Sequence, residues 1–332
     1  MLEQLLDLVR REETPEIQQE ITPAGTRFDY LEEGILRITP AADVPGARRL
    51  MLSAGIHGNE TAPMELLDRL TRAIARDTIR PAGPILIVYG NPPAIRAQRR
   101  YIIRDINRLF NQPDAPAGDT EEHRRARIIE TRTAEFFEQT PSALHIDMHT
   151  AIRESRIPTF ALLPGDEETT PDPQLLAMLS HTEIEAVIQQ HTPGVTFSSL
   201  SHFRHGARAV TLELGKARPF GQNQGVRVEA LESLLTALIE HRQHAEKSPH
   251  ALRLFDVTFE IIRTSDQFVL HVPNDQANFV AYPPNSCLAE DGAHRWMTDE
   301  HSRFLIFPNP GVDIGLRAGL VLRETQEYRP AV

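Results

Sequence analysis

Apolar runs typical of buried strands alternate with amphipathic stretches over the first three quarters of the chain. Four runs predict strands that are buried on both faces: RRLMLSAG (48–55), PILIVYG (84–90), ALHIDMHT (143–150) and ARAVTLELG (207–215). Stretches with apolar residues three and four positions apart predict helices at 60–76, 120–139, 173–190 and 226–243. This alternation indicates an α/β fold in which a mostly parallel mixed sheet lies between layers of helices.

The pattern changes near residues 244–251, and the rest of the chain is rich in short strand patterns. Examples are LRLFDVTFEIIRT (252–264), QFVLHVP (267–273), RFLIFPN (303–309) and AGLVLRE (318–324). We therefore divide the chain into a larger α/β domain, residues 1–248, and a smaller β-rich C-terminal domain, residues 249–332.

Composition narrows the classes of function. The chain has 332 residues, of which 40% are hydrophobic and 24% charged, as in soluble globular proteins. A net charge of −11 argues against nucleic-acid binding, and no apolar run approaches the roughly 18 residues of a membrane span. The start, MLEQLLDLVRREE, reads as an amphipathic helix rather than a signal peptide, and the single cysteine, Cys287, excludes an internal disulfide. We expect a cytoplasmic protein without membrane or nucleic-acid partners. The sequence is compatible with a homo-oligomer.

Chemistry-bearing residues follow the first of these strands and line one face of the third. SAGIHGNETAP (53–63) places His57 between Gly55 and Gly58, and Glu60 two residues later, in a loop directly after a buried strand. In LHIDMHTA (144–151), His145, Asp147 and His149 alternate with apolar residues and share one face. Because strand ends at one edge of a sheet converge on a common crevice, these residues are candidates for one site.

Two histidines and a carboxylate are favoured zinc ligands, and three protein ligands leave one position open for water in a catalytic site. His57, Glu60 and His149 form such a set, and Asp147 is placed to orient a ligand histidine. A polar residue on a strand is more often a satisfied buried group than a ligand, and we assign His145 to a structural or supporting role.

The fourth strand, TLELG (211–215), carries Glu213 among apolar residues. A buried isolated carboxylate is costly, so Glu213 must be paired, hydrogen-bonded or functional. Beside a metal it would act as the general base that takes a proton from the attacking water. A structural ion pair with Arg208 or Lys216 is an equal alternative.

Positive charge is concentrated in RRYIIRDINRLF (99–110), which contains Arg99, Arg100, Arg104 and Arg108. Arginine suits two-point binding of a carboxylate, and Asn107 could add a donor. The alternative is a solvated basic helix face, although apolar residues interleaved with the arginines indicate that part of the segment packs inward. An anionic substrate would need such a local patch on this acidic chain.

These segments together resemble the zinc carboxypeptidase superfamily, in particular its aspartoacylase and succinylglutamate desuccinylase branch. AGIHGNETAP resembles the first ligand motif, DINRLF the substrate motif, HIDMHTAIR the third ligand motif and TLELGKARPFGQN the glutamate strand. TLELGKA, FPNP and the closing segment FLIFPNPGVDIGLRAGLVL favour the desuccinylases over the aspartoacylases. The likeness covers nearly the whole chain.

The resemblance implies a zinc-carboxypeptidase-like α/β/α sandwich with a C-terminal domain that covers the cleft. It implies one Zn²⁺ per subunit on His57, Glu60 and His149, with Glu213 as the base. Arg100 would polarise the scissile carbonyl, and Asn107 and Arg108 would bind a substrate carboxylate. The family has a further arginine just before the glutamate strand, and this chain does not align with it there without a gap. Arg204 and Arg208 are therefore both candidates for that arginine.

The implied reaction is hydrolysis of N-succinylglutamate, a small anionic substrate, to succinate and glutamate, the last step of a bacterial arginine-catabolic pathway. The alternatives are an aspartoacylase-like amidase for another N-acyl amino acid, a peptidase, and a non-catalytic zinc-stabilised binding module. The module would hold zinc with four protein ligands and would have no use for Glu213.

Overall fold

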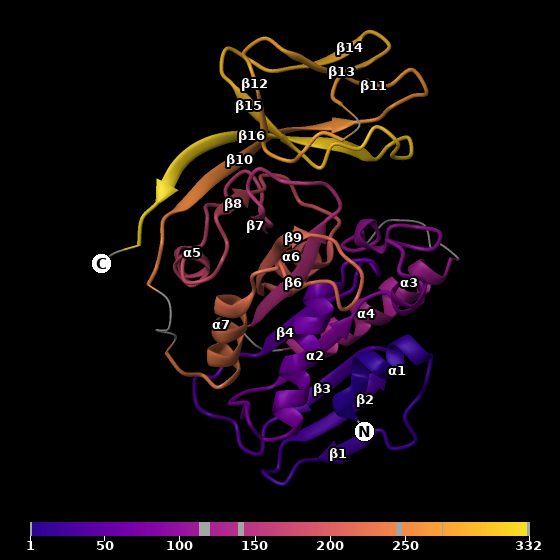
Figure 1. The fold of residues 1–332 in the computed structure, drawn as a ribbon, viewed down its shortest axis with the longest axis vertical. Coiled ribbons are helices and arrows are strands. Elements are labelled where there is room, and N and C mark those ends of the chain that lie inside the picture. Colours follow the sequence, from indigo (N-terminus) through magenta and orange to yellow (C-terminus); the bar gives the residue numbers. More distant parts are fainter. Residues whose placement is uncertain (1, 113–119, 139–142, 244–247, 274, 331–332) are drawn as a thin grey trace.

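A computed structural model describes residues 2–112, 120–138, 143–243, 248–273 and 275–330 of the chain (Figure 1). A thirteen-stranded sheet runs in the order β1-β2-β3-β5-β4-β6-β9-β7-β8-β10-β16-β15-β12, and a separate three-stranded sheet has the order β11-β13-β14. The fold is α/β with a mixed sheet and a β-rich C-terminal part, as the sequence pattern predicted.

The strands of the first three quarters are β1 (Gln19–Ile21), β2 (Arg27–Glu32), β3 (Ile35–Thr39), β4 (Leu50–Ala54), β5 (Ile85–Tyr89), β6 (Leu144–Ala151), β7 (Thr159–Leu163), β8 (Ala186–Gln189) and β9 (Arg208–Lys216). The C-terminal strands are β10 (Leu252–Ile262), β11 (Val269–Leu270), β12 (Val280–Tyr282), β13 (Cys287–Asp291), β14 (His294–Met297), β15 (Arg303–Ile306) and β16 (Arg317–Tyr328). The α-helices are α1 (Leu5–Arg11), α2 (Thr61–Ala75), α3 (Pro92–Ala97), α4 (Glu121–Phe137), α5 (Pro173–Leu179), α6 (Phe197–His205) and α7 (Glu229–Ile239), with 3₁₀ turns η1 (Leu2–Gln4) and η2 (Ile106–Arg108).

Helices cover both faces of the central strands (Figure 1). On one face, Leu144, Ile146 and Met148 of β6 share a buried cluster with apolar side chains of α1, α2, α5 and α7. On the other face, side chains of β4 and β5 share a second cluster with α4 and α6. The alternation along β6 therefore sends its polar residues toward the α4 and α6 side. None of the described helices has the length and apolar character needed to cross a membrane.

One predicted helix is wrong in its second half. Residues 173–190 form α5 only as far as Leu179, and Ala186–Gln189 form β8. β8 pairs in parallel with both β7 and β10, so neighbours on both sides supply its backbone hydrogen bonds. This tertiary pairing overrides the helical spacing of a short stretch.

The sheet continues into the C-terminal part without a break. β10 pairs in parallel with β8 over Arg253–Asp256 and antiparallel with β16 along its length. Figure 1 shows these two long strands leading from the central sheet to β11, β13 and β14 at the top. The C-terminal strands are thus fixed to the sheet edge beside β8.

Candidate metal and catalytic site

The site forms where three neighbouring parallel strands end. β4, β6 and β9 are adjacent, and the register places Ser53 opposite Asp147 and His149 opposite Glu213. Because the carboxyl ends of parallel strands meet at one edge, the loop after β4 comes close to these residues. The predicted convergence of the two motifs is therefore present.

A tight glycine-rich turn brings His57 and Glu60 over the end of β6. Gly55 has a φ of 68°, which favours glycine. A Cβ on Gly58 would lie 2.0 Å from the carbonyl carbon of Ala94, so only glycine fits there. The turn ends at Glu60, immediately before α2.

His57, Glu60 and His149 offer donor atoms that all lie within 4.8 Å of one another. His57 Nδ1 is 2.8 Å from Glu60 Oε1, and His149 Nδ1 is 2.9 Å from Glu60 Oε2. The two imidazole ring centroids are 5.1 Å apart, and the three residues are at most 3% exposed. The sequence had predicted this set of three, and a tetrahedral ion here would keep one position open.

Two aspartates fix the direction of both imidazoles. His57 Nε2 lies 3.0 Å from Asp105 Oδ1, and His149 Nε2 lies 3.0 Å from Asp147 Oδ2. Because a carboxylate only accepts, each Nε2 carries the hydrogen, and in the neutral ring each Nδ1 has a lone pair directed toward Glu60. Although the buried His57 Nδ1 lies close to Glu60 Oε1, it makes no hydrogen bond to any of the described residues. Two lone pairs and a carboxylate facing one another fit a shared cation.

The charges around these groups also favour a bound cation. Glu60, Asp147 and Glu213 are buried, Asp105 lies beside them, and Arg100 is within ion-pair distance of Glu60 and Asp105. Burial lowers the pKa of His149, but Asp147 and Glu60 more than offset this and raise it well above its usual value. The site therefore favours positive charge between its carboxylates, as a proton or as a metal ion.

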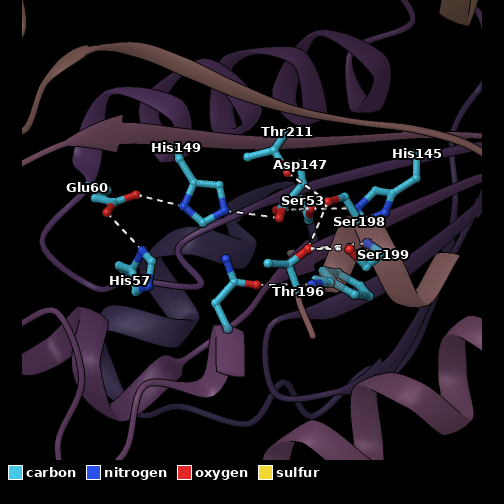
Figure 2. Close-up of polar contacts among 12 residues, drawn as sticks. Ser53, His57, Glu60, His145, Asp147, His149, Thr196, Ser198, Ser199 and Thr211 are labelled. Atoms are coloured by element: carbon cyan, nitrogen blue, oxygen red, sulfur yellow. Dashed lines mark hydrogen bonds and ion pairs between the residues drawn. The ribbon is translucent and has the colours of Figure 1, made fainter. Parts of the chain in front are cut away.

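Behind His149 a chain of hydrogen bonds runs through the protein interior (Figure 2). Ser53 Oγ donates to Asp147 Oδ1 at 2.6 Å, so it accepts from His145 Nε2 at 2.8 Å. His145 Nδ1 then accepts from Ser201 Oγ of α6, also at 2.8 Å. Burial lowers the pKa of His145 to about 4, so the ring is neutral. His145 supports Asp147, which agrees with the structural role expected for it.

Glu213 lies next to the three donors, and no cation of the described residues lies within ion-pair distance of it. Its Oε2 is buried and makes no hydrogen bond. The two cations considered as its partners are engaged elsewhere: Arg208 pairs with Asp172, and Lys216 with Glu154. Burial, followed by the charge of Glu60, raises the pKa of Glu213 to about 8.

Arg100 joins the cluster from the loop after α3. One of its terminal nitrogens is 3.2 Å from Glu60 Oε1 and the other 3.2 Å from Asp105 Oδ2. Its carbonyl accepts from the Gly58 amide at 3.3 Å, which ties this loop to the turn carrying His57. Residues 99–105 form no helix, so the basic helix face considered for this segment is absent.

Asn107 and Arg108 lie on η2, directly after Asp105. Asn107 Oδ1 accepts from the Phe197 amide at the start of α6, which leaves its Nδ2 hydrogens to offer. Arg108 donates to the Asn107 carbonyl, and in the described part of the chain no carboxylate lies within ion-pair distance of its guanidinium. Burial lowers the pKa of Arg108 to about 10, and Arg317 and Arg100 act in the same direction, while Asp105 opposes them. A half-buried guanidinium without a neighbouring carboxylate to neutralise it is suited to an anionic ligand.

The remaining arginines lie apart from this cluster. Arg104 is exposed and pairs with Asp313 of the C-terminal part at 3.0 Å. Arg208 stands at the start of β9, about 17 Å along the strand from Glu213. Arg204, on α6, bonds Asn111. The structure thus brings neither of the two arginines left open by the sequence into the cluster.

Asp105 is the residue that sequence reasoning missed. Its carboxylate accepts hydrogen bonds from His57 Nε2, from Arg100 and from the backbone amide of Asn107. Asp105 therefore connects the candidate metal ligand His57 with the two positions proposed to contact substrate. A signal was present, because an aspartate two residues before Asn107 is typical of a cap on a helical turn. That signal predicts the bond to Asn107 but not the contact with His57, which lies 48 residues away in the sequence.

Comparisons with known proteins agree with this geometry. The succinylglutamate desuccinylase/aspartoacylase catalytic domain model matches residues 46–239, and the AstE/AspA barrel-sandwich hybrid domain model matches residues 250–325. The chain is 47% identical over 326 residues to the succinylglutamate desuccinylase of Ectopseudomonas mendocina, covering 97% of this chain and 96% of that one. It is 46% identical to that of Pseudomonas aeruginosa strain LESB58, with 96% of both chains covered.

Solved structures give the same result. The succinylglutamate desuccinylase of Vibrio cholerae superposes with a TM-score of 0.89 at 30% identity, covering 96% of this chain and 94% of that one. That of Chromobacterium violaceum superposes with a TM-score of 0.82 at 33% identity, covering 97% and 98%.

Proposed function

The chain belongs to the succinylglutamate desuccinylase/aspartoacylase family, and we propose that it is a zinc hydrolase that cleaves N-succinyl-L-glutamate into succinate and L-glutamate. This would be the last step of arginine catabolism through the succinyltransferase pathway. The observation that carries the proposal is the set of three buried donors, turned toward one point by Asp105 and Asp147, with Glu213 beside it.

His57, Glu60 and His149 would hold one Zn²⁺ per subunit. The ion, when bound, supplies a Lewis acid that polarises the amide carbonyl and lowers the pKa of water. The donor set is the one preferred by catalytic zinc, and the group contains three donors rather than the four expected of a purely structural site. This supports the hydrolase over the zinc-stabilised binding module.

Glu213 is proposed as the general base. It would take a proton from the attacking water and deliver it to the nitrogen of the departing glutamate. A raised pKa, about 8 from burial and the neighbouring Glu60, suits a group that accepts and returns a proton near neutral pH. A divalent cation nearby would lower this pKa again and keep the resting carboxylate ionised.

The basic residues are proposed to hold the substrate. Arg100 would stabilise the negative charge that develops on the carbonyl oxygen, because it already lies against Glu60. Asn107 Nδ2 and the half-buried guanidinium of Arg108 would bind a substrate carboxylate. N-succinylglutamate has three carboxylates, which explains the demand for cations on an acidic chain.

We propose that residues 1–248 are the hydrolase domain and that residues 249–332 cover its cleft. The pair between Arg104 and Asp313 supports this, since it joins the loop carrying Arg100 to the C-terminal part. We also propose that the reaction takes place in the cytoplasm, in keeping with a chain that has one cysteine.

A hydrolysis assay tests the function. Purified protein should release succinate from N-succinylglutamate faster than acetate from N-acetylaspartate, and a chelator should abolish the activity until zinc is added back. Faster cleavage of another N-acyl amino acid would replace the proposed substrate with that of an aspartoacylase-like amidase. Activity that survives complete metal removal would refute the zinc hydrolase.

Two arginines of one segment provide matched variants for the same assay. Arg108→Ala should lower kcat/KM by about 10- to 100-fold, the effect of one lost charge-assisted hydrogen bond. Arg104→Ala removes an exposed guanidinium that already has a partner, and should change kcat/KM by less than about 3-fold. Equal effects of the two substitutions would contradict the role of Arg108.

A further inference from the structure

A second cluster of metal-ligating side chains lies in the three-stranded sheet at the top of Figure 1, away from β4 and β6. His271 follows β11, and Cys287 and Glu290 lie on β13. One ligand atom from each of the three lies within 4.8 Å of the others. Cys287 is the only cysteine of the chain and is not used by the proposed hydrolysis.

An irregularity in β13 places Cys287 and Glu290 on the same side. In a regular strand, residues three apart point to opposite faces. Here the pairing with β14 shifts register between Cys287 and Ala289, and both intervening residues, Leu288 and Ala289, are fully buried. The bulge therefore turns the thiol and the carboxylate outward together.

Strand pairing brings the histidine to them. Val269 and Leu270 pair with Glu290 and Ala289, and the His271 amide donates to the Leu288 carbonyl at 2.8 Å. His271 Nε2 is then 3.7 Å from Glu290 Oε2, and Cys287 Sγ is 3.6 Å from Glu290 Oε1. A tetrahedral zinc ion with ordinary bond lengths separates its ligand atoms by roughly 3.3–3.7 Å, so modest side-chain rotations would close a set that now lies within 4.8 Å.

We propose that His271, Cys287 and Glu290 form a second metal site, which binds Zn²⁺ and clamps the end of β11 to β13. The ion would replace the proton of the Cys287 thiol, which is released to solvent, and water would complete the tetrahedron. Thiolate and imidazole together select zinc over magnesium or calcium. The half-exposed position of His271 and Glu290 gives the ion access from solvent.

The neighbouring charges are compatible with this site. Arg295 Nε lies 3.0 Å from Glu290 Oε1, which anchors the carboxylate and leaves Oε2 toward His271. Burial and Glu290 raise the pKa of Cys287, so the thiol keeps its proton until a cation is present. This site should therefore bind more weakly than the buried one.

Cobalt provides a signal that only this site can give. We would add Co²⁺ to holoenzyme that carries one Zn²⁺ per chain, which fills the tighter buried site, and record the near-ultraviolet thiolate-to-cobalt charge-transfer band. Since the chain has one cysteine, the band must come from Cys287. We expect it to saturate at one ion per chain, to be displaced by Zn²⁺ and to disappear in Cys287→Ser.

Matched variants show whether cobalt is bound by all three residues or by the Cys287 thiol alone. His271→Asn and Glu290→Gln should each weaken cobalt binding about 10-fold or more. His294→Asn and Glu300→Gln remove an exposed histidine and an exposed carboxylate of the same region, and should leave it unchanged. Absence of the band, unchanged affinity in both cluster variants, or a band that depends on two chains meeting would overturn the proposal. Hydrolysis by Cys287→Ser should equal that of the parent protein, so this test and that of the hydrolase fail independently.

Discussion

The two clusters use nearly the same donors in opposite surroundings. His57, Glu60 and His149 are at most 3% exposed, whereas the side chains of His271 and Glu290 are 40% and 36% exposed. Each buried histidine also has its second nitrogen held by an aspartate. For His271, strand pairing with β13 places the backbone, and among the described residues the ring contacts only a half-exposed carboxylate, Glu290, through Nε2.

Both clusters bring possible metal ligands close together, but only the buried cluster also holds them in a fixed orientation. At the buried cluster, the tautomer and the ring direction are fixed before any ion arrives, so little order is lost on binding. At the exposed cluster, the ion must order side chains that water also solvates. We therefore expect the first site to be a strong catalytic centre and the second a weaker structural one.

The largest expected effect belongs to the group next to the buried cluster. Glu213→Gln should lower kcat by about 10²–10⁴-fold, because the base that accepts the proton of water is lost, while the zinc content stays the same. Steady-state rates and metal analysis of the same preparation measure both. Glu154→Gln, at an exposed carboxylate paired with Lys216, is the matched control. Near-normal turnover of Glu213→Gln would show that the residue is not the base.

The next effect tests the aspartate that orients His57. Asp105→Asn should weaken zinc binding by about 10- to 100-fold, because a neutral amide oxygen accepts the Nε2 hydrogen of His57 more weakly than a carboxylate does. Competition with a chromophoric chelator measures the affinity. Asp313→Asn, which removes an exposed carboxylate, should have no effect on it. The cobalt–thiolate band should be unchanged in both variants, and parallel losses at the two sites would indicate general unfolding instead.

The smallest effect concerns the hydrogen-bond chain behind His149. Burial lowers the pKa of His145 to about 4 from 6.5, so the unfolded chain binds the proton more tightly than the folded one. Stability should therefore be lost as the pH falls from 6.5 to 4, by at most roughly 3 kcal/mol from this residue. Urea unfolding of the metal-free protein at several pH values, compared with His145→Gln, isolates this share. An identical pH dependence in the two proteins would exclude His145 as its source.

Much of the fold was readable from local patterns. β4 and β5 lie within the predicted runs, β6 and β9 extend one residue beyond theirs, and α2, α4 and α7 lie within the predicted helical stretches. Long buried strands and amphipathic helices carry their own periodicity, which needs no tertiary information. The prediction was wrong at β8, because a strand of four residues is too short for its own periodicity to outweigh the helical spacing of the residues around it.

The order of residue types along the chain was enough to identify the chemistry of this protein: which residues could bind a metal, which carboxylate stood alone in an apolar strand, and where positive charge was concentrated. Residue type and alternation are local properties, and they are enough for that. Only the tertiary structure decided which of these groups meet. It joined Asp105 to His57, gave Arg204 and Arg208 partners elsewhere, left Arg108 without an ion-pair partner among the described residues and brought His271 to Cys287. Such contacts depend on register and strand order, which arise from packing over the whole sheet rather than from any one segment.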